Sequence, residues 1–229
     1  VLETANESVG QYGISNPLGG VAGWSEVYMN ASLESYLKGY NDPRIKSYFN
    51  LAQDGRDKEG NIIKEVAGVK QLNSIEGEYK GVRQGTGVAD HRYSTHSQTD
   101  ITTGSKIIVM SAAEVWFLRA EAALRNYTSE NVENCYKQGI TVSFAQWDAS
   151  GVSEYLESEE TPAAYVDAFD KKFDADAPTS ITPKWDESAP LELKLERIIT
   201  QKWLAIYPEG CEAWAEQRRT GYPQLIKVA

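Results

Sequence analysis

Glycine is distributed unevenly along this chain, since 14 of its 18 glycines lie before residue 106. Glycine adopts positive φ angles without steric cost and lets two backbones approach closely, so glycine-rich stretches favour turns and loops. The densest stretches are residues 19–23 and 81–87. We therefore expect residues 1–105 to be loop-rich and residues 106–229 to contain most of the helices.

The loop-rich part contains one helix pattern, from about Ser25 to Lys38, which Gly39 is suited to end. The apolar side of this predicted helix consists of Val27, Met29, Leu33, Tyr36 and Leu37. Asn41-Asp42-Pro43 then predicts a turn into a second short helix. Residues 54–61 predict a solvated hairpin rather than a calcium loop, because Gly55 stands where the first acidic ligand should be.

The helical part opens with Ser111-Ala112-Ala113-Glu114, a capping box in which side chains satisfy free amides at the start of a helix. It predicts one helix from Ser111 to about Asn126 and a second from about Ser129 to Trp147. The apolar positions at helical spacing are Trp116, Ala120, Ala123 and Tyr127, then Val132, Tyr136, Ile140, Phe144 and Trp147. We expect an antiparallel hairpin of the tetratricopeptide kind, with Trp116 and Phe144 buried.

Residues 148–188 predict loops with a short helix near Pro162 to Phe173. A second hairpin follows, in which Ser188 is a suitable N-cap for a helix from Leu191 to Ile206. Its partner is predicted at Cys211–Thr220. The fold class is therefore mostly α, with helical hairpins and an irregular loop-rich face.

Three tryptophans and both cysteines lie in these predicted helices. Trp116, Trp203 and Trp214 stand beside aliphatic residues, so we expect them in the core. Cys135 and Cys211 are predicted to be buried free thiols. A disulfide between them remains open, because the sequence does not give the distance between their Cα atoms.

The charge of the chain limits its partners. It has 33 acidic and 23 basic residues, a formal net charge of −10, and no basic stripe that would neutralise phosphates. Nucleic acid and anionic membrane surfaces are therefore disfavoured, whereas a neutral ligand such as a sugar is not. No run of about 18 apolar residues predicts a transmembrane helix. The chain opens with Val1 instead of methionine, so we expect a processed product or a fragment.

No recognisable catalytic set accompanies this pattern. His91 and His96 lie five residues apart in a polar loop, a spacing that does not place two metal ligands on one helix face, so we interpret them as surface-loop residues. Neither a Gly-x-Ser-x-Gly elbow nor a Walker loop occurs. We predict no catalytic residues, no metal and no cofactor.

A series of short segments between Trp24 and Pro223 carries a family resemblance. The segments are Trp24-Ser25-Glu26-Val27, Asn41-Asp42-Pro43-Arg44, Tyr79-Lys80-Gly81-Val82, residues 110–123, Tyr136-Lys137-Gln138-Gly139-Ile140, residues 199–203 and residues 212–223. In order and spacing they resemble the SusD/RagB-like family of outer-membrane glycan-binding lipoproteins. The resemblance implies a mostly α, SusD-like fold of tetratricopeptide-like hairpins with an irregular loop-rich face.

The resemblance also implies a cellular setting. Members are tethered by a lipid, facing outward, on the outer membrane of Bacteroidetes, where they pass glycans, or in some members peptides, to a SusC-like TonB-dependent transporter. Residues 1–229 resemble the C-terminal portion of a single such domain. The family's N-terminal half, with its signal peptide and lipidated cysteine, is absent here. We therefore expect the helix from Leu191 to Ile206 to present an apolar side that lacks a partner within this chain.

The implied function is non-catalytic capture of an oligosaccharide and its delivery to the transporter. Two other functions remain open: a glycoside hydrolase, which would release reducing ends, and a helical-repeat scaffold that binds only protein. Sugar rings stack on aromatic side chains, so the candidate ligand-binding residues are aromatic and polar groups of the loop-rich part. They are Tyr79, Tyr93, Trp24, Tyr28 and Tyr12, with Arg83 and Asn73 as polar partners. We expect Tyr79 and Tyr93 to be exposed, whereas Trp24 and Tyr28 have core packing as the alternative.

Overall fold

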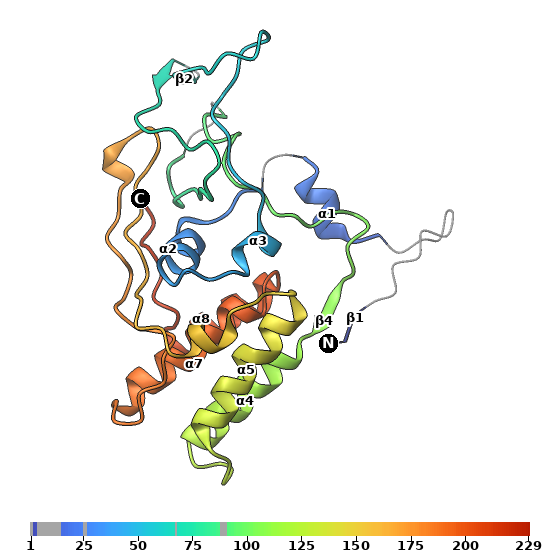
Figure 1. The fold of residues 1–229 in the computed structure, drawn as a ribbon, viewed down its shortest axis with the longest axis vertical. Helices are drawn as coiled ribbons and strands as arrows, with labels where there is room; N and C mark the ends of the chain where they lie inside the picture. Colours follow the sequence, from blue (N-terminus) through green and yellow to red (C-terminus); the bar gives the residue numbers. More distant parts are fainter. Residues whose placement is uncertain (1, 4–14, 25–26, 67, 88–90) are drawn as a thin grey trace.

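The computed structural model describes residues 2–3, 15–24, 27–66, 68–87 and 91–229. Two helical pairs, α4 with α5 and α7 with α8, occupy one half of the molecule, and loops with the short helices α1, α2 and α3 occupy the other half (Figure 1). The helices are α1 (Pro17–Ala22), α2 (Ala31–Gly39), α3 (Ile45–Tyr48), α4 (Ala112–Leu124), α5 (Val132–Gln146), α6 (Val152–Leu156), α7 (Leu191–Ala205) and α8 (Gly210–Thr220), with a 3-10 turn at Lys171–Phe173. The predicted mostly α fold with a loop-rich face is confirmed.

Two short antiparallel strand pairs complete the described structure. β1 (Leu2–Glu3) pairs with β4 (Ile108–Met110), and β2 (Glu65–Val66) pairs with β3 (Val69–Lys70). The first pair brings the N-terminal end of the chain beside the start of α4 (Figure 1).

The hairpin of α4 and α5 forms as the capping pattern predicts. The Ser111 hydroxyl accepts a hydrogen bond from the Glu114 amide at 3.1 Å, and Asn131 caps α5 in the same way. The contact face of α4 is nevertheless rotated from the predicted stripe. Phe117 is fully buried, whereas Trp116 is half-buried and Tyr127 is 78% exposed. Phe144 is buried as expected.

Close approach of α4 and α5 depends on Gly139. A Cβ atom at this position would lie 2.7 Å from the Phe117 ring, which is itself fully enclosed. We expect Gly139→Ala to lower the free energy of unfolding by about 1–3 kcal/mol through overpacking. Gly210→Ala is the matched control, since a Cβ there meets nothing within 4 Å. Urea unfolding measures both, and an unchanged or raised stability in Gly139→Ala would contradict the close contact.

The apolar side of α7 is covered within this chain, contrary to expectation. α7 packs on both α4 and α5, and Leu195, Ile198, Ile199 and Leu204 lie in the main core. The predicted helix is confirmed, but the expectation that its apolar side lacks a partner within this chain is wrong, because the hairpin of α4 and α5 covers that side. Exposed apolar side chains on α7 are confined to its first turn, at Leu191 and Leu193.

A buried ion pair fixes the turn between α2 and α3 to α5. Arg44 and Asp42 are both fully buried, with Nη2 of Arg44 2.5 Å from Oδ2 of Asp42. Nη1 of Arg44 donates to the Ser143 hydroxyl of α5 at 2.8 Å, and the guanidinium lies over the Phe144 ring. The segment Asn41-Asp42-Pro43-Arg44 thus places an arginine in the core, where it contacts buried side chains of its own turn and of α5.

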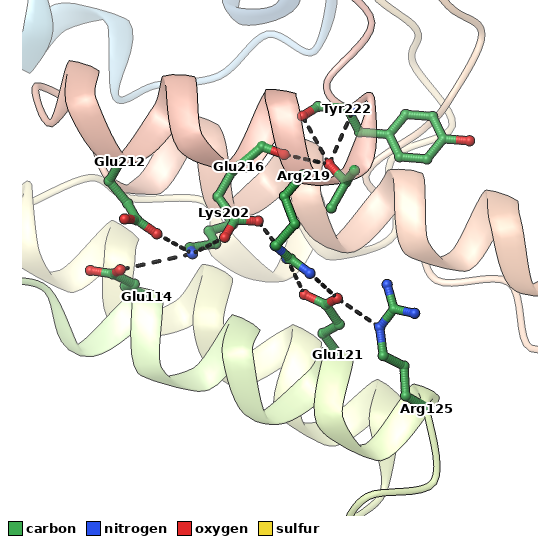
Figure 2. A network of polar contacts seen from close by, with 9 residues as sticks. Glu114, Glu121, Arg125, Lys202, Glu212, Glu216, Arg219 and Tyr222 are labelled. Carbon is green, nitrogen blue, oxygen red and sulfur yellow. Dashed lines mark hydrogen bonds and ion pairs between the residues drawn. The ribbon is translucent and has the colours of Figure 1, made fainter.

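Figure 2 shows a second charged network, which joins α4, α7 and α8. Nζ of Lys202, on α7, is 2.8 Å from Glu212 and 3.0 Å from Glu216, both of α8, and 3.8 Å from Glu114 of α4. Arg219 of α8 binds Glu121 of α4. Lys202 is only 1% exposed, so the ion pairs, together with apolar packing, hold the two helical pairs together.

Several local predictions are wrong. The helix predicted from Ser25 begins at Ala31, because Asn30 caps it by accepting from the Ser32 amide. Pro162–Phe173 is extended, with Tyr165 bridged to Ala175, apart from its final 3-10 turn. Ser188 does not cap α7, which begins after Pro190.

The tryptophan and cysteine predictions also need correction. Trp214 is 62% exposed, because α8 turns Glu216 inward toward Lys202 and leaves the indole outside under Arg218. Trp203 is half-buried against the core. Both cysteines are free, but Cys135 alone is buried.

Candidate functional site

Tyr93 is buried, which contradicts its predicted exposure. The side chain is 5% exposed and packs edge-on against Phe169, while its hydroxyl donates to the carboxylate of the buried Asp167. Burial, followed by the negative charge of Asp167, raises the pKa of Tyr93 well above its ordinary value. Polar sequence neighbours suggested solvent, but a residue 74 positions away supplies the partner that makes burial favourable. Tyr93 is therefore part of a small satellite core.

Tyr79 and the two polar candidates lie in different settings. Tyr79 is half-buried against the main core. Arg83 donates to the carbonyl oxygens of Lys227, Phe173 and Asp174, so it ties the C-terminal segment to the loop-rich part. Asn73 is exposed at the edge of a cavity beside α2.

Trp24 is the most exposed of the described aromatic candidates. Its side chain is 71% exposed, two residues after the end of α1, and its amide donates to the Val21 carbonyl. Core packing, the alternative for this residue, is therefore excluded. Tyr12 lies outside the described residues. Tyr28 is half-buried and pairs in an isolated bridge with Gln98.

Tyr28 lines an apolar cavity of about 210 Å³, which we name the α1 pocket because Leu18 and Val21 of α1 also line it. Its walls include Leu18, Val21, Val27, Tyr28, Leu33 and Tyr207. Leu18, Val21 and Val27 are all exposed, so the pocket opens on an apolar surface.

The sequence around α1 explains why this surface is held in place. Asn16 caps α1 by accepting from the Leu18 amide, and Pro17 occupies the first helical position. Gly19 sits against the backbone of Thr102 and Thr103, where a Cβ atom would lie 2.0 Å from the Thr102 carbonyl carbon. Any larger residue would force α1 away from this segment and open the pocket.

Tyr207, which lines the α1 pocket, is held in place by neighbouring side chains. Tyr207 stacks on the fully buried Tyr48 with ring centroids 4.4 Å apart, and its hydroxyl is 2.5 Å from the Thr99 hydroxyl. Burial raises the pKa of Tyr207 to about 12, so the hydroxyl stays protonated at physiological pH. Aromatic rings fixed in this way need little reordering when a ligand binds.

A polar cavity adjoins the α1 pocket. Leu18, Ile101 and Pro208 line both, and the second cavity, of about 340 Å³, also contains Asp100 and Glu209. Burial raises the pKa of Glu209. The two cavities together offer apolar stacking surface next to groups that accept hydrogen bonds.

The sequence of residues 1–229 matches the SusD-like family, described as Susd and RagB outer membrane lipoprotein. The chain belongs to the SusD-like family. A search of curated proteins gives no match.

Solved SusD homologues have the same fold as this SusD-like chain. A chitin-binding SusD homolog from Flavobacterium johnsoniae is 38% identical, with a TM-score of 0.80 over 93% of this chain and 41% of its own. A homolog from Bacteroides vulgatus is 42% identical, with a TM-score of 0.80 over 97% of this chain and 43% of its own. A third, from Bacteroides uniformis, is 35% identical, with a TM-score of 0.79 over 94% and 42%. The chain thus spans about two fifths of the length of these relatives.

Other features of the SusD-like chain do not extend this candidate site. His96 is 3% exposed and enclosed by Tyr93 and Phe169, so the prediction of a surface loop is wrong for it. Burial and then the charge of Lys80 lower the pKa of His96 to about 3, which leaves the ring neutral at physiological pH. Among the described residues, no helix is long and apolar enough to cross a membrane.

Proposed function

We propose that this chain forms part of a non-catalytic protein that captures an oligosaccharide, with Trp24 and the α1 pocket as the contact surface. The observation that carries the proposal is an indole 71% exposed just after α1, the helix whose Leu18 and Val21 line an apolar cavity together with Tyr28. An exposed aromatic face stacks on the C–H face of a sugar ring, while nearby carboxylates accept from its hydroxyls. Asp100 and Glu209 provide such acceptors in the adjoining cavity.

The family supports the remaining steps. It is one of outer-membrane lipoproteins, and a homolog 38% identical to this chain is described as chitin-binding. We propose that the 229 residues are the C-terminal portion of a longer protein whose N-terminal half carries the lipid anchor. That protein would hold its ligand at the outward face of the outer membrane and deliver it to a SusC-like TonB-dependent transporter.

The proposed contact makes Trp24→Ala the decisive change. Loss of stacking on one sugar face removes about 1–3 kcal/mol of apolar burial, so we expect affinity to fall by about 5- to 150-fold. Isothermal titration of the complete protein with N-acetylglucosamine oligomers measures the change, and a glycan array selects another ligand if these do not bind.

Trp214→Ala is the matched control. Trp214 is also an exposed tryptophan, at 62%, but it lies on α8, which contributes no residue to the α1 pocket. It should leave affinity unchanged. Equal losses in both variants, or none in Trp24→Ala, would exclude the proposed site. Oligosaccharide recovered intact by chromatography after long incubation would support capture over hydrolysis, and absence of all glycan binding would favour a protein-binding scaffold.

A further inference from the structure

A third cavity lies beside α2, which we name the α2 pocket. It has a volume of about 340 Å³ and is formed by α2, the loop of residues 73–80 and the extended segment of residues 163–168. In Figure 1 the extended segment of residues 163–168 lies on the opposite side of α2 from α1. None of the residues that line the α1 pocket lines this one, so the two cavities are separate.

One wall of the α2 pocket is a ladder of alternating charges. Nζ of Lys80 lies 2.8 Å from Glu34, Glu34 lies 3.5 Å from Lys38, and Lys38 lies 3.1 Å from Glu78. The side chains of Lys80 and Glu34 are only 7% and 6% exposed, whereas Lys38 and Glu78 lie at the open rim. The wall thus alternates hydrogen-bond donors and acceptors from its base to its mouth.

The buried end of this ladder is fixed in position. The second oxygen of Glu34 accepts from the Gly81 amide at 2.8 Å, and the Lys80 ammonium lies 4.4 Å from the centre of the Tyr165 ring. Ser35, next to Glu34 on α2, donates to the Ala163 carbonyl and so holds the opposite wall against the helix. Such fixed groups bind a ligand without a large ordering cost.

The remaining lining contains three polar residues, Ser35, Asn73 and Ser74, and an aliphatic part that consists of Ile75, Ala163, Ala164, Val166 and Ala168. Alanine side chains are short, so this part of the lining leaves room for the C–H face of a sugar ring. A pyranose ring needs both kinds of wall, because its hydroxyls both donate and accept while its C–H groups are apolar. The ladder contains two lysines and two glutamates, so its formal charge is zero and favours a neutral ligand.

We infer that the α2 pocket is a second saccharide-binding site, which takes one neutral, hydroxyl-rich ring without aromatic stacking. The inference rests on the proposed function for the ligand class, but it uses different residues. Two separate sites on one chain would let a long glycan bind at two points, which raises overall affinity beyond that of either contact.

Alanine methyl resonances of the complete protein report on this site directly. Titration with D-glucose and with N-acetylglucosamine should shift the methyl signals of Ala163, Ala164 and Ala168. Lys38→Met retains the aliphatic stem and removes the donor at the rim. It should lower the sugar affinity measured in this titration by about 10- to 100-fold, the loss expected for a hydrogen bond to a charged group. Ala164→Phe fills the cavity from an exposed position and should abolish the shifts.

Trp24→Ala separates the two sites. It should leave the alanine titration unchanged, even where it abolishes oligosaccharide binding at the α1 pocket. If Trp24→Ala loses oligosaccharide binding and the wild type shows no alanine shifts, the α2 site is overturned and the proposed function stands. If the glycine zwitterion shifts the alanine signals and sugars do not, the α2 pocket does not take a neutral saccharide. Alanine shifts without any effect of Trp24→Ala would instead support the α2 site against the proposed one.

Discussion

Arg44→Ala should destabilise the complete protein by about 3–5 kcal/mol, because it leaves the carboxylate of Asp42 buried without its cation. Both side chains are fully enclosed, and the guanidinium also donates to Ser143 of α5. The loss therefore combines an unpaired buried charge with a broken link between the loop-rich part and the helical hairpin. The free energy of unfolding in urea measures it.

Arg56→Ala is the matched surface control. Arg56 and Glu76 form an ion pair at 2.9 Å in which both side chains are more than 40% exposed. Exposed pairs contribute about 0–1 kcal/mol, so this variant should remain close to wild type. The double variant Asp42→Asn with Arg44→Met should lose less than the two single losses together, since no buried charge is left. A small effect of Arg44→Ala would show that water reaches Asp42.

The sequence was most informative where local chemistry decides the structure. The capping box at Ser111 placed the start of α4 to within one residue, and Gly221 adopts φ +79° at the end of α8. Periodicity identified the helices after residue 110 but not which side of each faces inward. In α4 the contact with Gly139 selects Phe117, and Trp116 turns outward under Arg119.

The candidate site was harder to predict, because long-range partners decide the exposure of a loop residue. Tyr93 is buried, and Asp167 accepts the hydrogen bond from its hydroxyl. Trp24 remains exposed because α1 ends before it. Of the α2 pocket, the sequence identified Asn73 alone. Its ladder joins Glu34 of a helix to Lys80 of a loop 46 residues later. An isolated glutamate or lysine in the sequence gives no sign of such a pairing.

Lys202→Met should lower the free energy of unfolding by about 3–5 kcal/mol at neutral pH, because three glutamates share its ammonium group. Lys202 is 1% exposed, and Glu114, Glu212 and Glu216 come from two other helices (Figure 2). Without the cation, the contact between the two helical pairs holds three carboxylates, of which Glu216 keeps an ion pair with Arg219. Lys184→Met is the matched control, since Lys184 and its partner Glu159 are both exposed.

At acidic pH, the difference in the free energy of unfolding between Lys202→Met and the wild type should become smaller. The hydrogen bond from Lys202 lowers the pKa of Glu212 below its ordinary value. A carboxyl with a lowered folded-state pKa contributes stability above its unfolded pKa of about 4.3, and this contribution disappears as pH falls through the folded value. As the pH falls through the folded-state pKa of Glu212, the wild type therefore loses the contribution of its ion pair with Lys202, whereas protonation of the carboxylates relieves the repulsion that destabilises the variant. Urea unfolding of both proteins from neutral pH to below pH 4 measures the difference. A constant difference across that range would mean that Lys202 acts through packing of its aliphatic stem rather than through its charge.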